Sequence, residues 1–90
     1  MNERYLRIKS ELTKKLSPKI LKIRDDSALH ATHGNVKKED KETHFYIKIA
    51  STVFNNKSKI DMHKLVYKIL KAEFSRGLHA LELELNDVEK

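Results

Sequence analysis

The fold is decided by residues 63–85, which read HKLVYKILKAEFSRGLHALELEL. Apolar side chains recur at helical spacing in the first part, so we predict a helix that begins near Ser58. The positions expected to face the core are His63, Val66, Tyr67, Leu70 and Phe74. Gly77 is the expected end of this helix, because glycine adopts the left-handed conformation that closes many helices. Leucine and glutamate then alternate through residues 81–85, which predicts a half-buried strand beginning near Leu78.

An amphipathic helix is predicted near the start of the chain, over about residues 2–16. Its apolar positions recur at intervals of three and four, at Tyr5, Ile8, Leu12 and Leu16. Pro18 should end it, because proline cannot donate a backbone hydrogen bond and disfavours helical geometry at the preceding residue.

Two strands are predicted between the two helices, and we expect them to be antiparallel neighbours. In the first, Leu21 and Ile23 alternate with cationic residues before the turn formers of residues 25–27. In the second, apolar side chains alternate through residues 45–49, and Asn55-Asn56 should close the strand after Phe54. The segment of about residues 26–42 shows no periodicity and is predicted to be a long solvated loop, of the kind that often carries function.

The order helix, strand, strand, helix, strand predicts one mixed α/β (α+β) domain over residues 1–90, with a polar tail at 86–90. Hydrophobic residues make up 39% of the 90 residues and charged residues 36%, with both signs present. A chain of this length and composition is expected to build a single small core.

Composition excludes several classes of protein. The chain has no cysteine, so it cannot form a disulfide framework, a thiol nucleophile or an all-thiolate metal site by itself. The first residues lack an apolar signal region, and no stretch approaches the ~20 apolar residues that cross a bilayer. We therefore expect a cytoplasmic protein without membrane attachment. A formal net charge of +6 favours attraction to nucleic acid, anionic lipid or an acidic protein surface.

The residues give no convincing catalytic constellation. The serines lack the glycines of a nucleophile elbow, and two glycines in the whole chain cannot make a phosphate-binding loop. Asp25 and Asp26 are adjacent, so their side chains point apart in an extended segment. We expect a protein that is not an enzyme.

Histidine is the residue type that could hold a metal ion. His30 and His33 have a spacing compatible with a shared metal, although exposed loop histidines are the favoured interpretation of such a pair alone. His63 falls on the apolar stripe of the second helix, so we expect a structural, half-buried histidine bonded to a neighbouring loop. His44 is expected on the less buried face at the start of the second strand. His79 begins the last strand and is expected either to pack at the rim of the core or to act as a ligand.

A row of lysines is predicted nearly opposite the apolar stripe of the second helix. Its members, Lys57, Lys64, Lys68 and Lys71, fall within roughly 60° of one another on a helix. Such a row could lie along phosphates, in which case binding would weaken with salt. A solvated helix face is the alternative that the residues alone favour.

The motifs of the chain, taken in order, resemble those of the BolA family. They are Leu16-Ser-Pro, Asp25-Asp-Ser, His30, Thr43-His-Phe, Phe54-Asn-Asn-Lys-Ser58, His63-Lys-Leu-Val-Tyr67 and Gly77-Leu-His-Ala-Leu81. The resemblance covers the chain from about Tyr5 to Leu85. It implies an αββαβ domain like a type II KH fold, with a three-stranded sheet packed against helices.

The resemblance also implies a heterodimer with a monothiol glutaredoxin that shares a 2Fe-2S cluster and acts in iron-sulfur cluster trafficking or in iron or redox regulation. The matching ligands here would be His79 and His30, with His33 as an alternative to His30. The glutaredoxin and its glutathione would bring the thiolates that this chain lacks, so the isolated chain would bind no cluster.

Some BolA proteins are DNA-binding regulators of transcription, stress response or morphology, which makes the lysine row an alternative site for DNA. The chain has no Gly-x-x-Gly motif, so we do not expect it to bind single strands in the KH manner. It also departs from the family pattern where Met62 and Lys64 replace arginines and Asn56 replaces glycine, which weakens any expectation of arginine-dependent contacts. A weak homodimer stays open as a further assembly.

Overall fold

The computed structural model describes residues 3–27 and 43–88. Its elements are α1 (Glu3–Leu16), β1 (Ile20–Asp25), β2 (His44–Ala50), the short 3-10 helix η2 (Thr52–Phe54), α2 (Lys59–Ile69), α3 (Lys71–Ser75) and β3 (Ala80–Asn86). This order confirms the predicted mixed α/β fold, with a second helix that is divided in two. None of the described helices is both long enough and apolar enough to cross a membrane.

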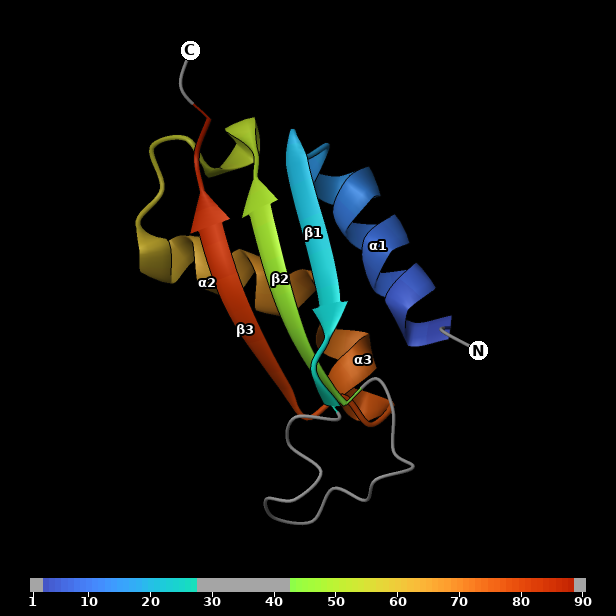
Figure 1. The fold of residues 1–90 in the computed structure, drawn as a ribbon. Coiled ribbons are helices and arrows are strands. Elements are labelled where there is room, and N and C mark those ends of the chain that lie inside the picture. Colours follow the sequence, from blue (N-terminus) through green and yellow to red (C-terminus); the bar gives the residue numbers. More distant parts are fainter. Residues whose placement is uncertain (1–2, 28–42, 89–90) are drawn as a thin grey trace.

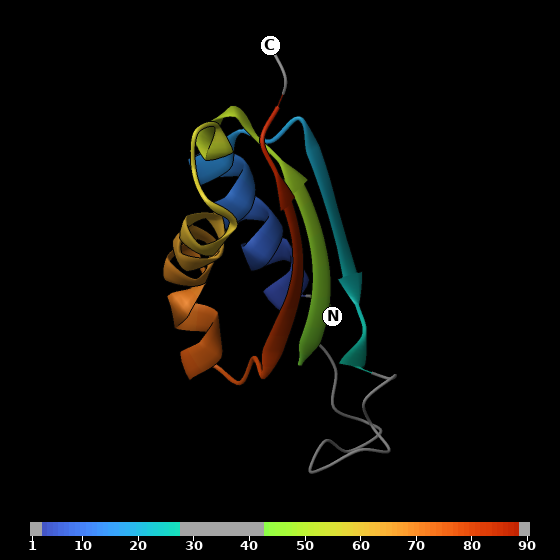
Figure 2. The same cartoon turned by 90° about the vertical axis from the view of Figure 1, so that its left-hand side faces the viewer.

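The three strands form one sheet with β2 in the centre (Figure 1). β1 runs antiparallel to β2, as expected, and β3 runs parallel to it. A parallel neighbour requires the chain to cross over between the two strands, and α2 and α3 provide that crossover. Viewed edge-on, the helices all lie against the same face of the sheet (Figure 2).

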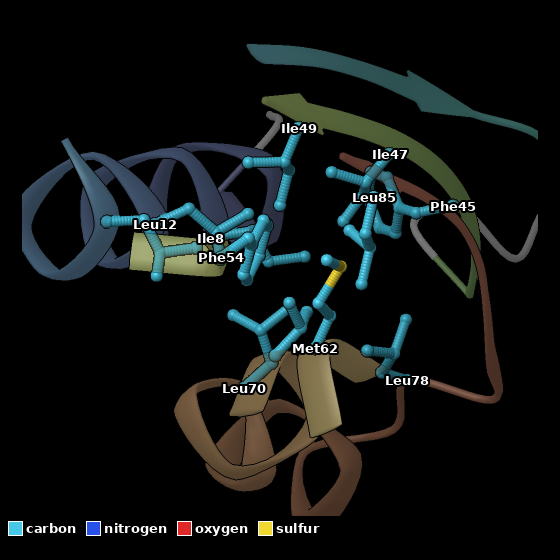
Figure 3. Close-up of a cluster of buried hydrophobic side chains, with 12 residues drawn as sticks. Ile8, Leu12, Phe45, Ile47, Ile49, Phe54, Met62, Leu70, Leu78 and Leu85 are labelled. Atoms are coloured by element: carbon cyan, nitrogen blue, oxygen red, sulfur yellow. The ribbon is translucent and has the colours of Figure 1, made fainter. Parts of the chain in front are cut away.

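The core lies between the helices and the inner face of the sheet (Figure 3). Its strand residues come from the predicted alternation, since Phe45, Ile47 and Ile49 are all buried. The first helix contributes its buried positions Ile8, Leu12 and Leu16, as its spacing predicted. Burying an aliphatic or aromatic side chain of this size contributes about 1.5–3 kcal/mol, so these two patterns position the sheet and the first helix.

The second helix differs from the prediction in its rotation. Val66 and Leu70 are buried as predicted, whereas Tyr67 is 45% exposed, and Met62, which the pattern left out of the core face, is buried. His63 is half-buried, as predicted, but its Nδ1 donates to the Lys59 carbonyl of the same helix at 2.7 Å and not to a neighbouring loop. The reason is that Met62 lies four residues before Val66 and eight before Leu70, so these three form a stripe one residue away from His63 and Tyr67, and this stripe meets the core.

This helix also breaks where the sequence pattern runs on. Leu70, with φ −99° and ψ 14°, separates α2 from α3, which ends at Ser75. Gly77 follows with a φ of +114°, consistent with its predicted role in ending the helical segment.

The strand ends also differ from the prediction. β2 ends at Ala50 and not at Phe54, because the Ser51 hydroxyl accepts the Val53 N–H at 3.1 Å and starts η2. β3 begins at Ala80 rather than near Leu78, and it includes Asn86, which the pattern assigned to the polar tail. The N–H of Val88 donates to the Asn55 side chain at 3.0 Å, so the chain after β3 is held against the turn before α2.

Candidate functional site

One edge of the sheet collects the ends of three strands. β1 ends there, while β2 and β3 begin there, because β1 alone runs in the opposite direction (Figure 1). Ser27 and Thr43, which flank residues 28–42, therefore both lie at this edge together with His79. The two other predicted ligands, His30 and His33, lie outside the described residues.

The backbone of His79 is held firmly at this edge. Its N–H and that of Ala80 both donate to the Thr43 carbonyl, at 2.8 and 3.2 Å. The His79 side chain itself is exposed. Of the two interpretations, packing at the rim or presentation to a ligand, the exposed imidazole fits the second, because a fixed backbone with an accessible ring can be reached from outside.

His44 lies directly beside His79. The ring centroids are 5.6 Å apart, with the ring planes at 74°. The Thr43 hydroxyl oxygen is 3.1 Å from Nδ1 of His44, within hydrogen-bond distance. Sequence reasoning gave His44 no functional role, although the Thr43-His-Phe motif was the signal that could have identified it.

A network of ion pairs fixes the end of β1. It lies on the face of the sheet that the helices do not cover. Arg24 donates to both carboxylate oxygens of the buried Asp26, at 2.7 and 3.0 Å, and its guanidinium lies 4.6 Å from the centre of the Tyr46 ring. The hydrogen bond to Asp26 raises the pKa of Arg24. Because both carboxylate oxygens of Asp26 bind Arg24, we do not include Asp26 among the candidate metal ligands at this edge.

The same network continues across the sheet to β3. Tyr46 donates its hydroxyl to Glu84 at 2.7 Å, and Lys48 lies 3.6 Å from the same carboxylate. The hydrogen bond to Glu84 raises the pKa of Tyr46, and that same bond lowers the pKa of Glu84. These contacts join all three strands next to the edge of the sheet that carries His44 and His79.

The structure separates the predicted site residues into two regions. His79 lies at the sheet edge, whereas His63 lies on α2 and takes no part in that edge. Within residues 3–27 and 43–88, no group of three or more histidine, aspartate or glutamate side chains is arranged to hold a metal ion. The imidazoles that the described chain offers at this edge are therefore those of His44 and His79.

Three of the four lysines in the predicted row lie together on one surface, and the fourth does not. Lys64, Lys68 and Lys71 line a shallow hollow on the solvent side of α2, together with Lys59, Ile60, His63 and Tyr67. Lys57 is not among these residues, because it precedes Ser58, whose side chain caps α2 by accepting the Asp61 N–H at 3.1 Å. The surface is thus mixed, with three of the four predicted lysines around an exposed isoleucine and tyrosine.

Comparison with known proteins identifies the family to which this fold belongs. A family model described as BolA-like protein matches residues 12–89. SufE-like protein 1, chloroplastic/mitochondrial, from Arabidopsis thaliana is 40% identical over 86 residues, which cover 92% of this chain and 23% of that protein. Protein BOLA1, chloroplastic, from the same plant is 40% identical over 84 residues, with coverage of 92% and 52%. The DNA-binding transcriptional regulator BolA of Haemophilus influenzae is 35% identical over 78 residues, with coverage of 87% and 71%.

The three-dimensional comparison agrees. The solved BolA domain of SufE1 from Arabidopsis thaliana superimposes with a TM-score of 0.86 and 38% identity, covering 97% of this chain and 94% of that structure. The chain belongs to the BolA-like protein family. It spans 23% and 52% of the two plant relatives, so what those whole proteins do is not carried over to it.

Proposed function

We propose that this protein is an adaptor that binds a monothiol glutaredoxin and shares a 2Fe-2S cluster with it, in iron-sulfur cluster trafficking or in iron or redox regulation. The observation that carries the proposal is the position of His79, an exposed imidazole on a fixed backbone at the edge of the sheet. Membership of the BolA-like family supports it. No catalytic role is assigned to any residue.

The chemistry of the available ligands fits this proposal. Histidine can replace cysteine as a ligand on one iron of a 2Fe-2S cluster. This chain has no cysteine, so thiolates for the cluster would have to come from the glutaredoxin and its glutathione. His79 would serve as one ligand, and His30 or His33 as the second. Both flanks of the segment that carries these two residues, Ser27 and Thr43, lie at the edge that bears His79.

Anaerobic reconstitution tests the proposal. The cluster of a monothiol glutaredoxin should change its visible circular dichroism when the chain is added, and the change should be lost with His79→Ala. The double variant His30→Ala/His33→Ala should reduce it. His63→Ala is the matched control, because this histidine lies on α2, and it should behave as the wild type. Spectra of the His79→Ala mixture identical to those of the wild-type mixture would refute the assignment of His79.

A second candidate function is DNA binding by a transcriptional regulator. The name of the Haemophilus influenzae relative supports it, as does the group of exposed lysines on α2. In that case affinity for double-stranded DNA should fall steeply with salt, and Lys64→Glu/Lys68→Glu should abolish binding. Binding that does not respond to salt would exclude this function.

We propose the cytoplasm as the compartment of this protein. This differs from the two plant relatives, whose names place those proteins in chloroplasts or mitochondria. Microscopy of the tagged protein in its source cell tests the proposal, since signal confined to an organelle would contradict it.

A further inference from the structure

We propose that the outer face of α2 is a docking site for an acidic amphipathic helix of a partner protein. The site is the shallow hollow on the solvent side of this helix, which Lys64, Lys68 and Lys71 line together with Ile60 and Tyr67. We call it the α2 hollow. It is independent of the proposed function, because none of the residues that line it lies at the sheet edge that carries His79.

The α2 hollow exposes two large apolar side chains. Ile60 is 68% exposed and Tyr67 is 45% exposed. Two such side chains within one hollow favour a partner that covers them. The Tyr67 ring also packs against the ring of Phe74, with centroids 5.5 Å apart and ring planes at 56°. Its position is therefore supported before any partner binds, as is typical of the aromatic anchors of protein–protein interfaces.

The charge around the α2 hollow has a single sign. Four lysines line it and no carboxylate does. Lys59 is already engaged, since its amine donates to the Leu85 carbonyl and to the side-chain oxygen of Asn86. The other three lysines are exposed and make no ion pair within residues 3–27 and 43–88. Charge complementarity therefore selects a partner that carries carboxylates.

The spacing of the lining residues favours a helix as the occupant. Ile60, His63 and Tyr67 recur at intervals of three and four along α2, which correspond to positions a, d and a of a coiled-coil heptad. Lys64 and Lys71 then fall at e positions, which pair with charges on the facing helix in coiled coils. A partner helix packed alongside α2 would cover the apolar side chains and place its own glutamates against these lysines.

Other occupants fit the α2 hollow less well. A DNA duplex would pair its phosphates with the lysines, but phosphate oxygens give Ile60 and Tyr67 no apolar partner. An anionic membrane would need a larger apolar face than two exposed side chains provide. A second copy of this chain would place lysines opposite lysines, and the net charge of +6 adds to that repulsion.

Fluorescence anisotropy with a synthetic peptide tests the proposal. The probe is a labelled, stapled helix of about three heptads with leucine at a and d and glutamate at e and g. It should bind the wild-type chain saturably, and its affinity should fall as salt is added. Ile60→Ala should weaken binding roughly tenfold, and Lys64→Glu should weaken it roughly fivefold. The same peptide with lysine in place of glutamate should not bind.

Two substitutions on α1 are the matched controls. Leu6→Ala shortens another apolar side chain, which is 60% exposed. Lys9→Glu makes the same charge change as Lys64→Glu at another exposed lysine. Both variants should bind the glutamate peptide as the wild type does. Far-UV circular dichroism confirms that each variant is folded.

Three results would each overturn the proposal: no saturable binding of the glutamate peptide, equal binding of the lysine peptide, or binding that Ile60→Ala leaves unchanged. Parallel titrations use random-sequence duplex DNA and phosphatidylserine vesicles. If either binds while the glutamate peptide does not, the α2 hollow belongs to that occupant instead. The titration contains no glutaredoxin, so its failure leaves the cluster reconstitution unaffected, and failure of the reconstitution leaves the titration unaffected.

Discussion

Arg7 and Glu73 form a two-pronged ion pair that fastens the first helix to α3. Nε of Arg7 donates to one carboxylate oxygen of Glu73 at 2.8 Å, and Nη2 donates to the other at 2.9 Å. Glu73 is 6% exposed, and Arg4 and Arg76 also approach it, at 3.4 and 3.9 Å. One buried carboxylate thus contacts three arginines, two from α1 and one that directly follows α3.

Replacement of this carboxylate should destabilise the domain. We expect Glu73→Gln to lower the free energy of unfolding by about 2 kcal/mol, in line with a charge-assisted hydrogen bond of about 1.5–3 kcal/mol. Urea denaturation measures the change. Glu11→Gln is the control, because Glu11 makes a surface pair with Lys14 at 3.6 Å, and such pairs contribute about 0–1 kcal/mol. Equal effects of the two substitutions would show that the buried pair has no special role.

The same residue should give the stability a defined acid dependence. The hydrogen bond from Arg7 lowers the pKa of Glu73 below its ordinary value of 4.5. A carboxyl group whose pKa is lower in the folded state contributes its full stabilisation above pH 4.5, and loses it as pH falls through the folded-state pKa. The difference in unfolding free energy between wild type and Glu73→Gln should therefore be constant near neutral pH and shrink below pH 4.5. A difference that grows on acidification would contradict this account.

Gly77 should resist substitution. Its φ of +114° lies in a region that residues with a Cβ atom rarely adopt, and an added Cβ would lie 3.3 Å from Nη2 of Arg4. We expect Gly77→Ala to cost about 1–2 kcal/mol of stability, measured by thermal or urea unfolding. Ser75→Ala, at an exposed position two residues earlier, should change stability by less than about 0.5 kcal/mol. Comparable effects at the two positions would rule out a backbone cause.

The rotation of α2 can be tested by a pair of substitutions. Met62 is 4% exposed and Ile60 is 68% exposed. Met62→Ala should lower stability by about 2–5 kcal/mol, as large-to-small changes in a core do, whereas Ile60→Ala should have an effect within about 0.5 kcal/mol. Denaturation curves of both variants measure the two losses of stability. A larger loss for Ile60→Ala than for Met62→Ala would mean that the helix presents its other stripe to the core.

Local patterns predicted several elements because their cause is local. The spacing of Ile8, Leu12 and Leu16 can bury one face of a helix only if that segment is helical, and the alternation at residues 45–49 and 81–85 can bury one face of a strand only if those segments are extended. The order and approximate position of the strands and of the first helix follow from such patterns, whereas the division of the second helix into α2 and α3 does not. The antiparallel pairing of the first two strands was also predictable.

Other features depended on contacts that no local pattern contains. The buried stripe of α2 could be read as either of two neighbouring apolar rows, and packing against the sheet selected Met62 over His63. β2 ended early because the Ser51 hydroxyl accepts the Val53 N–H and starts η2, and the same hydroxyl donates to the Leu16 carbonyl at 2.6 Å, a contact between distant parts of the chain. Lys57 was counted with α2 because its angular position fits, but the cap at Ser58 leaves it outside the helix.

The sequence by itself determined the fold class, and its ordered motifs indicated the family and marked His79 as a candidate ligand. Only the tertiary structure decided that His44 lies beside His79. One residue begins β2 and the other precedes β3, and their contact exists because these two strands are parallel and start at the same edge. Hydrophobic periodicity records which face of an element is buried, but it carries no information about which ends meet. That information lies in the strand pairing and its register, which arise when distant segments pack on the same core.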